Sequence, residues 1–184
     1  MKEPGWKLNL NWITPQLAVG GRFPVEAVEH MALQLGIRHV VDVRVEARDD
    51  EHVLREHGIT FLHLPTVDLR AINEEMLEDG VRWVSEHLEL GHKVYIHCEH
   101  GVGRSATLAL CVLVAQGDSP LEALERAKTA RWQVAPSPEQ LEAFMQWSEG
   151  WRARHGVPWK VPAFKALSEI AYRHLRKPPK VEEE

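Results

Sequence analysis

A cysteine and an arginine lie six positions apart in the segment VYIHCEHGVGRSATLALCVLVAQG, which spans residues 94–117. A short apolar run ends at His97 and Cys98, five residues with two glycines follow, and Arg104 and Ser105 lead into a second apolar run. We expect a strand, a tight loop and a buried helix in this order. Such a loop directs backbone N–H groups at one point in front of a helix N-terminus, which is a site for an anion. The planar guanidinium of Arg104 adds donors that fit two phosphate oxygens.

The loop predicts a nucleophile at the centre of a phosphate-binding site. Gly101 and Gly103 allow a tight loop whose amides turn inward. The helix N-terminus and Arg104 favour the thiolate form of Cys98. A thiolate in this position can attack phosphorus and form a phosphocysteine, while the amides and the guanidinium stabilise the changing charge on the oxygens. The predicted phosphate-binding residues are Glu99, His100, Gly101, Val102, Gly103 and Arg104.

The stretch from His97 to Ser105 resembles the signature of the cysteine-dependent protein tyrosine phosphatases, and the surrounding layout resembles their compact dual-specificity branch. The resemblance covers about residues 10–150. It implies the phosphatase-type α/β fold and hydrolysis of phosphotyrosine, with phosphoserine and phosphothreonine as further substrates of a shallow pocket, without a metal or other cofactor. It also implies that Ser105 stabilises the leaving thiolate, that His97 fixes the loop and tunes the thiol, and that Gln140 lies near the site.

Phosphoryl transfer also needs a proton donor for the leaving oxygen, and the family places an aspartate on a mobile loop about thirty residues before the cysteine. Asp68 lies thirty residues before Cys98, in LPTVDLRAIN, between an expected strand and an expected helix. We therefore expect Asp68 to act as general acid and then as the base that hydrolyses the phosphocysteine. Two other aspartates are weaker candidates, because Asp42 lies within the strand-like run VVDVR and Asp79 faces outward from a helix.

Other functions remain compatible with this loop. The same chemistry can act on a non-protein substrate, such as a phosphoinositide, a sugar phosphate or an RNA 5′ phosphate. Glu99, an acid inside the loop, argues against a polyphosphorylated substrate. A phosphate-binding module without turnover is a second alternative, although the cysteine, the arginine and the aspartate that inactive relatives usually lose are all present. A sulfur-transfer or arsenate-reducing enzyme is a third, but Cys111 lies inside the following helix with little prospect of reaching Cys98.

Strand-like and helix-like runs alternate along the chain. The pattern predicts an α/β fold whose central twisted sheet has about four to five strands, mostly parallel, with helices on both faces. We expect strands at residues 38–43, 59–65 and 93–98. Besides the apolar helix after the loop, we expect helices at residues 24–36, 49–58, 73–91, 119–131, 137–156 and 163–177.

Composition and charge predict one globular body with an appendage. The chain has 184 residues, a net charge of −5 and a hydrophobic fraction of 44%, which fit a single catalytic domain over residues 1–150. That part carries 14 Lys and Arg against 23 Asp and Glu, whereas residues 151–180 carry eight basic residues and one acidic residue. We expect residues 151–184 to form a basic helical extension and tail, either packed on the body or docking an acidic partner through residues 151–180.

The sequence favours a cytoplasmic location with no membrane span. The N-terminus lacks the apolar core of a signal peptide, and the longest apolar run, residues 106–115, is too short to span a bilayer. The two cysteines, Cys98 and Cys111, form no disulfide framework, which favours a reducing compartment.

Most histidines and tryptophans are interpreted as structural. A metal site formed by His97, Cys98 and His100 lacks a second cluster of ligands, because the other histidines are scattered singly along the chain. Those histidines are expected at the surface or in satisfied structural positions: His39, His52, His57, His63, His87 and His92. Four tryptophans on helical patterns are expected in the core: Trp83, Trp132, Trp147 and Trp151.

Overall fold

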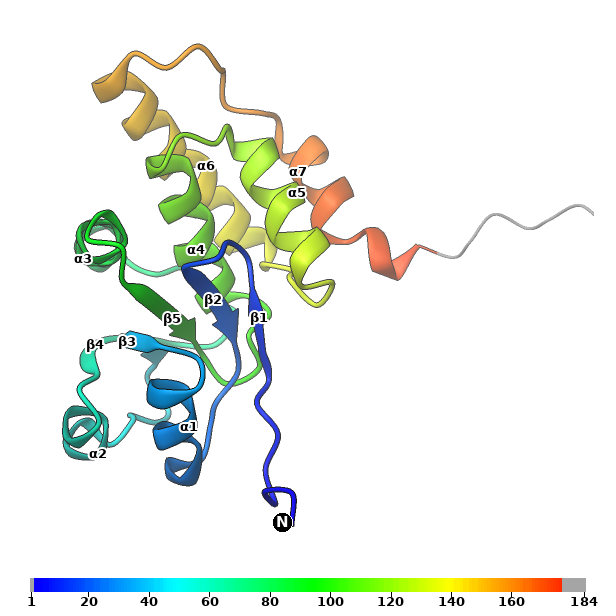
Figure 1. The fold of residues 1–184 in the computed structure, drawn as a ribbon. Helices are drawn as coiled ribbons and strands as arrows, with labels where there is room; N and C mark the ends of the chain where they lie inside the picture. Colours follow the sequence, from blue (N-terminus) through cyan, green and yellow to red (C-terminus); the bar gives the residue numbers. More distant parts are fainter. Residues whose placement is uncertain (1, 177–184) are drawn as a thin grey trace, which may run out of the picture.

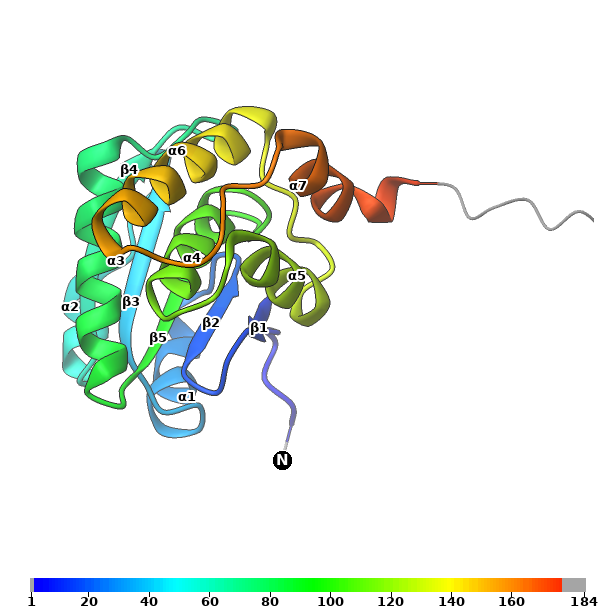
Figure 2. The ribbon, with the colours of Figure 1, turned by 90° about the horizontal axis from the view of Figure 1, so that it is seen from above.

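The computed structural model describes residues 2–176, in which a five-stranded sheet lies between two layers of helices (Figures 1 and 2). The strand order is β1-β2-β5-β3-β4, with β1 antiparallel to β2 and the other pairs parallel. This confirms the predicted α/β fold with a mostly parallel sheet. The strands are β1 (Leu10–Trp12), β2 (Leu17–Gly20), β3 (Ile37–Arg44), β4 (Thr60–Thr66) and β5 (Lys93–His97). The helices are α1 (Val28–Leu33), α2 (Glu51–Glu56), α3 (Glu74–Glu89), α4 (Arg104–Ala115), α5 (Pro120–Ala130), α6 (Pro138–His155) and α7 (Phe164–Ala171), with 3-10 turns at Val25–Ala27 and Arg173–Leu175.

The sheet is extended by two N-terminal strands that the sequence did not predict. β2 pairs in parallel with β5, and β1 pairs antiparallel with β2. All four residues of β2 are buried, so this strand shows no alternation of apolar and polar residues, and β1 has only three residues. Runs as short as these carry too little periodicity for a sequence-based prediction.

The two faces of the sheet bury separate hydrophobic clusters, because side chains alternate along a strand. On β5, Tyr95 joins the cluster on the side of α1 and α2, together with Met31 and Leu54. Its neighbours Val94 and Ile96 join the larger cluster on the opposite side, which includes residues of α3 to α7. Figure 1 shows these two helical layers on either side of the strands, as the sequence predicted.

The helix α4 lies at the centre of the larger layer. All its residues from 104 to 114 are buried, and each Leu or Val so buried contributes about 1.5–3 kcal/mol of transfer free energy. It contacts α3, α5, α6 and the strands behind it. This packing fixes the N-terminus of α4, and with it the loop that follows β5.

The C-terminal segment packs against the body of the protein. α7 lies beside α5 and α6 (Figure 2), and its Leu167 and Ala171 are buried. The expected helix 163–177 is shorter in the structure, because the α-helix ends at Ala171 and a 3-10 turn follows. Residue 177 and the rest of the predicted tail lie outside the described residues.

A buried lysine joins α7 to α5. The ammonium group of Lys128 donates hydrogen bonds to the carbonyl oxygens of Val134 and Ala171, at 2.8 Å each, and to Nδ1 of His174 at 2.7 Å. Three donors thus meet three acceptors, which satisfies a protonated lysine without a carboxylate partner. Burial, followed by the charge of Arg173, lowers the pKa of Lys128 to about 8.

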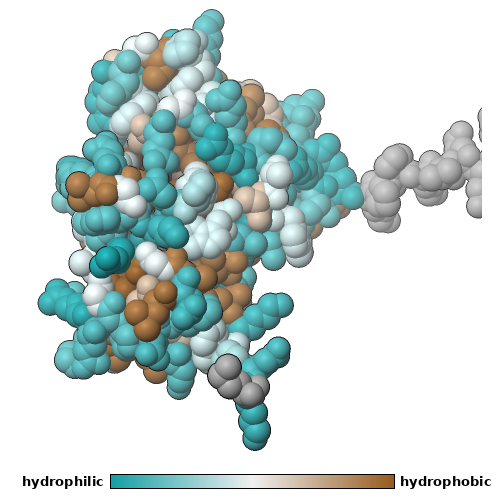
Figure 3. Space-filling view, viewed as in Figure 1, coloured by the Kyte–Doolittle hydropathy of each residue, from teal (hydrophilic) through white to brown (hydrophobic). Residues whose placement is uncertain are grey.

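The surface in the view of Figure 3 is mostly hydrophilic, and hydrophobic side chains on this face gather in its lower half, over α1 and the nearby end of the sheet. Among the helices of residues 2–176, none combines the length and apolar character needed to cross a bilayer.

Candidate active site

The loop of residues 98–103 joins β5 to α4, and its carbonyl groups point away from its centre. Because a trans peptide places its N–H opposite its C=O, the amides that follow these carbonyls face inward, in the direction that anion binding needs. Each carbonyl from Glu99 to Gly103 accepts a hydrogen bond from the surrounding chain, the donors being Arg22 N, Arg131 Nη2, Arg131 Nε, Ala135 N and Thr107 N.

Two glycines allow this loop to be compact. Gly101 has φ of +68°, and a Cβ atom there would lie 2.4 Å from the backbone of Gly20. A Cβ atom on Gly103 would lie 2.4 Å from Oε1 of Gln140. A larger residue at Gly101 would therefore push the loop away from β2, and one at Gly103 would displace the side-chain amide of Gln140.

Cys98 lies at the centre of the loop and is almost buried, with 3% of its surface exposed. Its Sγ is 3.2 Å from Oγ of Ser105 and accepts a hydrogen bond from the amide of Gly101 at 3.3 Å. The N-terminus of α4 begins six residues later at Arg104. A thiolate at this point gains two donors and the positive end of a helix. The hydroxyl of Ser105 is placed where it can stabilise a departing thiolate.

The guanidinium of Arg104 is held on one edge and free on another. Nη1 and Nη2 donate to the two carboxylate oxygens of Glu46 at 2.5 and 2.8 Å, and Nη1 also donates to the carbonyl of Thr66 at 2.9 Å. Nε is buried and has no hydrogen-bond partner within the described residues. Nε and the second N–H of Nη2 lie on the same edge of the plane, so this edge is left for two phosphate oxygens.

Glu46 is a site residue that sequence reasoning missed. It comes two residues after β3, and its partner Arg104 is 58 residues away, so no local pattern points to it. The hydrogen bond from Arg104 is the largest cause that lowers the pKa of Glu46 to about 2. Burial is the largest effect on Arg104 and lowers its pKa, but the hydrogen bonds to Glu46 and the nearby charges of Cys98, Glu46 and Asp68 together raise the pKa overall. Both groups are therefore charged across the ordinary pH range.

Asp68 lies on the loop between β4 and α3, at the free edge of Arg104. Its side chain is 63% exposed, and its Oδ1 is 3.6 Å from Nε of Arg104. Oδ1 also accepts a hydrogen bond from the amide of Leu69, which has φ of +66°. The structure thus brings the predicted general acid to the side of the guanidinium that is open for phosphate.

The N-terminus of α6 holds the Asp68 loop in place. Oγ of Ser137 donates to the carbonyl of Leu69 at 2.7 Å, and Nε2 of Gln140 donates to the carbonyl of Arg70 at 3.1 Å. Oε2 of Glu139 accepts from the amide of Ala71 at 2.7 Å. Gln140 therefore lies between this loop and Gly103, near the site as the resemblance implies, and its contacts are with the backbone.

The two competing aspartates lie elsewhere. Asp42 is fully buried within β3, where it accepts hydrogen bonds from Arg44 and from the amide of Asp49. Asp79 pairs with Arg82 on the exposed side of α3. Neither can meet a leaving group in front of Cys98.

An ionic network supports the loop from behind. Nε2 of His97 lies 2.5 Å from the carboxylate of Asp49, and Nδ1 of His97 lies 3.2 Å from the carbonyl of Cys98. Arg44 pairs with Asp42, Asp49 and Glu99. His97 thus contacts the backbone of the nucleophile and not the open side of the loop.

This network changes the interpretation of two side chains. Glu99 pairs with Arg44 and with Arg22, so its charge is balanced outside the phosphate-binding concavity. Glu99 therefore does not disfavour a polyphosphorylated substrate, contrary to the expectation from the sequence. Asp42, Asp49 and His97 are close enough to hold a metal ion, but Arg44 already supplies their positive charge.

A second missed residue is Arg131, which closes the outer side of the loop. It is 2% exposed, and its guanidinium donates to the carbonyls of His100 and Gly101 and to the side chains of Asn9 and Asn11. Its partners lie 30 to 122 residues away in the sequence. Spacing along the chain therefore gives no signal for this role.

The expectation that Trp132 lies in the core is wrong. Trp132 is 64% exposed, on the turn after α5. Three histidines that are scattered singly along the chain, His39, His87 and His92, lie in one cluster in the structure. His100 is exposed and joins neither group of possible metal ligands.

The fold and the loop between β5 and α4 are those of a phosphatase domain of the dual-specificity type. A family model described as "PTP-SAK: Swiss Army Knife protein, DSP-PTPase phosphatase domain" matches residues 7–149. The chain belongs to this family, which confirms the resemblance drawn from the sequence.

Relatives and solved structures agree with this assignment. "Phosphatidylglycerophosphatase and protein-tyrosine phosphatase 1" of Mus musculus is 32% identical over 102 residues, which are 54% of this chain and 53% of that protein. The chain thus spans about half the length of this protein and of its Rattus norvegicus and Homo sapiens counterparts. The structure described as "Crystal Structure of PTPMT1 in complex with PI(5)P" has a TM-score of 0.74 and 25% identity, covering 79% of this chain and 98% of that one. "Crystal structure of Tk-PTP in the active form" has a TM-score of 0.70 and 27% identity, covering 77% and 97%.

Proposed function

We propose that this protein hydrolyses phosphate monoesters through a phosphocysteine formed on Cys98. The observation that carries the proposal is the free edge of Arg104, which lies beside inward-facing amides and a buried cysteine. Phosphate bound by these donors presents its phosphorus to Sγ, and the amides and Arg104 stabilise the equatorial oxygens. Asp68 protonates the leaving oxygen and then activates water, while Ser105 stabilises the thiolate as it departs.

The first experiment measures p-nitrophenyl phosphate hydrolysis in EDTA, with vanadate as inhibitor. We expect activity that vanadate blocks, that Cys98→Ser abolishes, and that Cys111→Ala retains, because Cys111 lies inside α4. Cys98→Ser should still bind tungstate, since the amides and Arg104 remain. A folded protein that binds tungstate without any turnover would instead support a phosphate-binding module.

Phosphotyrosine, phosphoserine and phosphothreonine in proteins form the first proposed substrate class. A second class, a phosphorylated lipid, is favoured by the residues around the mouth of the site. Val45, Val67 and Leu69 follow the ends of β3 and β4, next to Glu46 and Asp68, and each is more than half exposed. Exposed apolar side chains around an anion site can contact the apolar part of a lipid while the site binds its charged head group.

A matched comparison separates the two classes. We expect Val45→Ser and Val67→Ser to lower the turnover of a vesicle-bound phospholipid monoester and to leave p-nitrophenyl phosphate unaffected. Leu90→Ser is the control, because Leu90 is also more than half exposed but lies at the far end of α3. Equal activity of all three variants on the lipid, with high activity on phosphopeptides, would favour a protein substrate.

We also propose that residues 1–150 form the catalytic unit and residues 151–184 a basic extension, of which residues 177–184 lie outside the described chain. Packing of the extension on the body is supported by buried Leu167 and Ala171. It is also supported by the ion pairs Arg154–Glu78 and Arg173–Glu125. An acidic partner for residues 151–180 and a cytoplasmic location stay predictions.

A further inference from the structure

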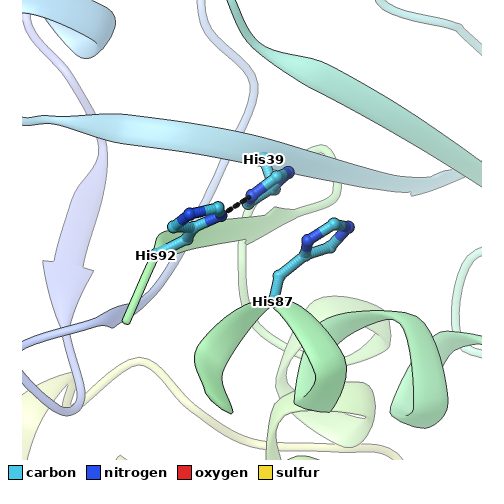
Figure 4. A group of neighbouring side chains, drawn as sticks. All are labelled: His39, His87 and His92. Carbon is cyan, nitrogen blue, oxygen red and sulfur yellow. Dashed lines mark hydrogen bonds between the residues drawn. The ribbon is translucent and has the colours of Figure 1, made fainter. Parts of the chain in front are cut away.

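Three histidine side chains meet at the end of the sheet opposite the Cys98 loop (Figure 4). His39 lies near the start of β3, His92 immediately precedes β5, and His87 lies in the last turn of α3. The Cys98 loop follows the other end of β5, so the two sites are separated by the length of that strand. None of the three histidines takes part in the proposed reaction.

His39 and His92 face each other through their ring nitrogens. Nε2 of His39 is 2.8 Å from Nδ1 of His92, and Nδ1 of His39 is 2.6 Å from Oγ1 of Thr60. When Nδ1 of His39 donates to Thr60, the lone pair of Nε2 points toward His92. This is the arrangement in which an outer partner fixes the tautomer of a metal-binding histidine.

His87 supplies a third nitrogen at the same place. Its ring stacks on that of His39 with 3.5 Å between centroids, and its Nδ1 is buried without a hydrogen-bond partner in the described chain. One nitrogen from each ring lies within 4.8 Å of the others. Nitrogens bound to one Zn²⁺ at about 2.0–2.1 Å are roughly 3.3 Å apart in a tetrahedron. To bring its nitrogen to this distance, the His87 ring must turn out of its stack with His39.

The surroundings of His39 and His87 favour the neutral form of imidazole, which is the form that binds metals. Burial, followed by the charges of His87, His92 and Arg38, lowers the pKa of His39 to about 4. Burial also lowers the pKa of His87, against the opposing effect of Glu86. Figure 4 shows the three rings converging from α3 and from two neighbouring segments of the sheet.

We propose that His39, His87 and His92 form a binding site for a divalent transition-metal ion of the Zn²⁺ type. Imidazole ligands suit Zn²⁺, Cu²⁺ and Ni²⁺, and three protein ligands leave a fourth position for water. The ion replaces the proton shared by His39 and His92 and links α3 to the sheet. Because it binds the folded state only, it raises stability in proportion to the logarithm of its concentration.

The test is Zn²⁺ titration by calorimetry on the full chain, stripped with EDTA and carrying Cys98→Ser so that the active-site thiol cannot compete. We expect one ion per chain. His87→Gln and His92→Gln should each weaken binding by at least about 100-fold, and Thr60→Val by about 10–100-fold, as loss of an outer partner does. His52→Gln is the matched control, because His52 is an exposed histidine on α2.

A second readout uses Co²⁺, whose visible absorption reports tetrahedral nitrogen coordination. The band should appear in the parent and in His52→Gln, and be absent from His87→Gln and His92→Gln. The proposal is overturned if the parent binds no ion, if both histidine variants bind Zn²⁺ as tightly as the parent, or if His52→Gln loses binding equally. Circular dichroism verifies that each variant is folded.

Discussion

Arg104 and Glu46 lie end to end, with Nη1 and Nη2 donating to the two carboxylate oxygens at 2.5 and 2.8 Å. This pair determines which edge of the guanidinium is left for phosphate. It also fixes the side chain of an arginine that is only 1% exposed. Glu46, which lies 58 residues before Arg104 in the sequence, is thus part of the geometry of the candidate phosphate-binding site.

Glu46→Gln should lower kcat/KM for p-nitrophenyl phosphate by about 10–100-fold, since a hydrogen bond to a charged partner contributes about 1.5–3 kcal/mol. Glu46 stays ionised well below neutral pH because Arg104 lowers its pKa to about 2. Its protonation therefore makes no contribution to the pH–rate profile above about pH 4. Steady-state kinetics on Glu46→Gln and on Glu51→Gln, a partly exposed carboxylate on α2 that pairs with Arg48 and Arg55, check this. Unchanged kcat/KM in Glu46→Gln would contradict the role of the pair.

Asp68→Asn should lower kcat for phenyl phosphate by about 10²–10⁴-fold, because a poor leaving group needs a proton from the general acid. The loss should be far smaller for p-nitrophenyl phosphate, which departs as an anion. Asp79→Asn, an exposed aspartate on α3, serves as control. Equal losses with both leaving groups would remove Asp68 from this role.

Ser137→Ala should impair the reaction while Ser119→Ala should not. Both serines are N-caps in capping boxes, at the starts of α6 and α5, so each variant should lose about 1 kcal/mol of stability. Only Ser137 also donates to Leu69 in the Asp68 loop. Urea unfolding and kinetics with phenyl phosphate, run on both variants, separate the two effects. A similar kcat in the two proteins would show that α6 does not position this loop.

Lys128→Met should destabilise the protein by about 2–4 kcal/mol, because it leaves buried acceptors on Val134 and Ala171 without donors. Lys165→Met, an exposed change on α7, should stay within about 0.5 kcal/mol of the parent. Denaturant unfolding followed by tryptophan fluorescence measures both. A small effect at Lys128 would mean that α7 does not depend on this lysine.

Acid should weaken the metal-free protein through His39. The pKa of His39 in the folded state, about 4, lies below the ordinary histidine value of 6.5 because the ring is buried, so the unfolded chain binds the proton more readily between these values. Stability therefore falls as pH drops from about 6.5 to about 4. Urea unfolding in EDTA across this range should give a shallower decrease for His39→Asn than for the parent. His52→Gln should follow the parent, and an identical slope in all three would contradict the expected burial effect.

The local elements could largely be predicted from the sequence. The strand ending at His97, the glycine loop and the apolar helix each carry a strong local signal, and Asp68 falls on the loop where it was expected. The short strand β2 was not found, because four buried residues show no alternation.

The sequence by itself determined the α/β framework and the choice of Cys98 and Arg104 as candidate site residues, because these depend on residues close together in the chain. Only the tertiary structure decided which side chains from distant parts of the sequence complete the candidate site. Glu46, which follows β3, contacts Arg104, and Arg131, which follows α5, contacts the carbonyl of Gly101. The three histidines, scattered in the sequence, converge because parallel strands align their starts at one end of the sheet, next to the last turn of α3. Contacts of this kind are set by packing, and no local pattern encodes them.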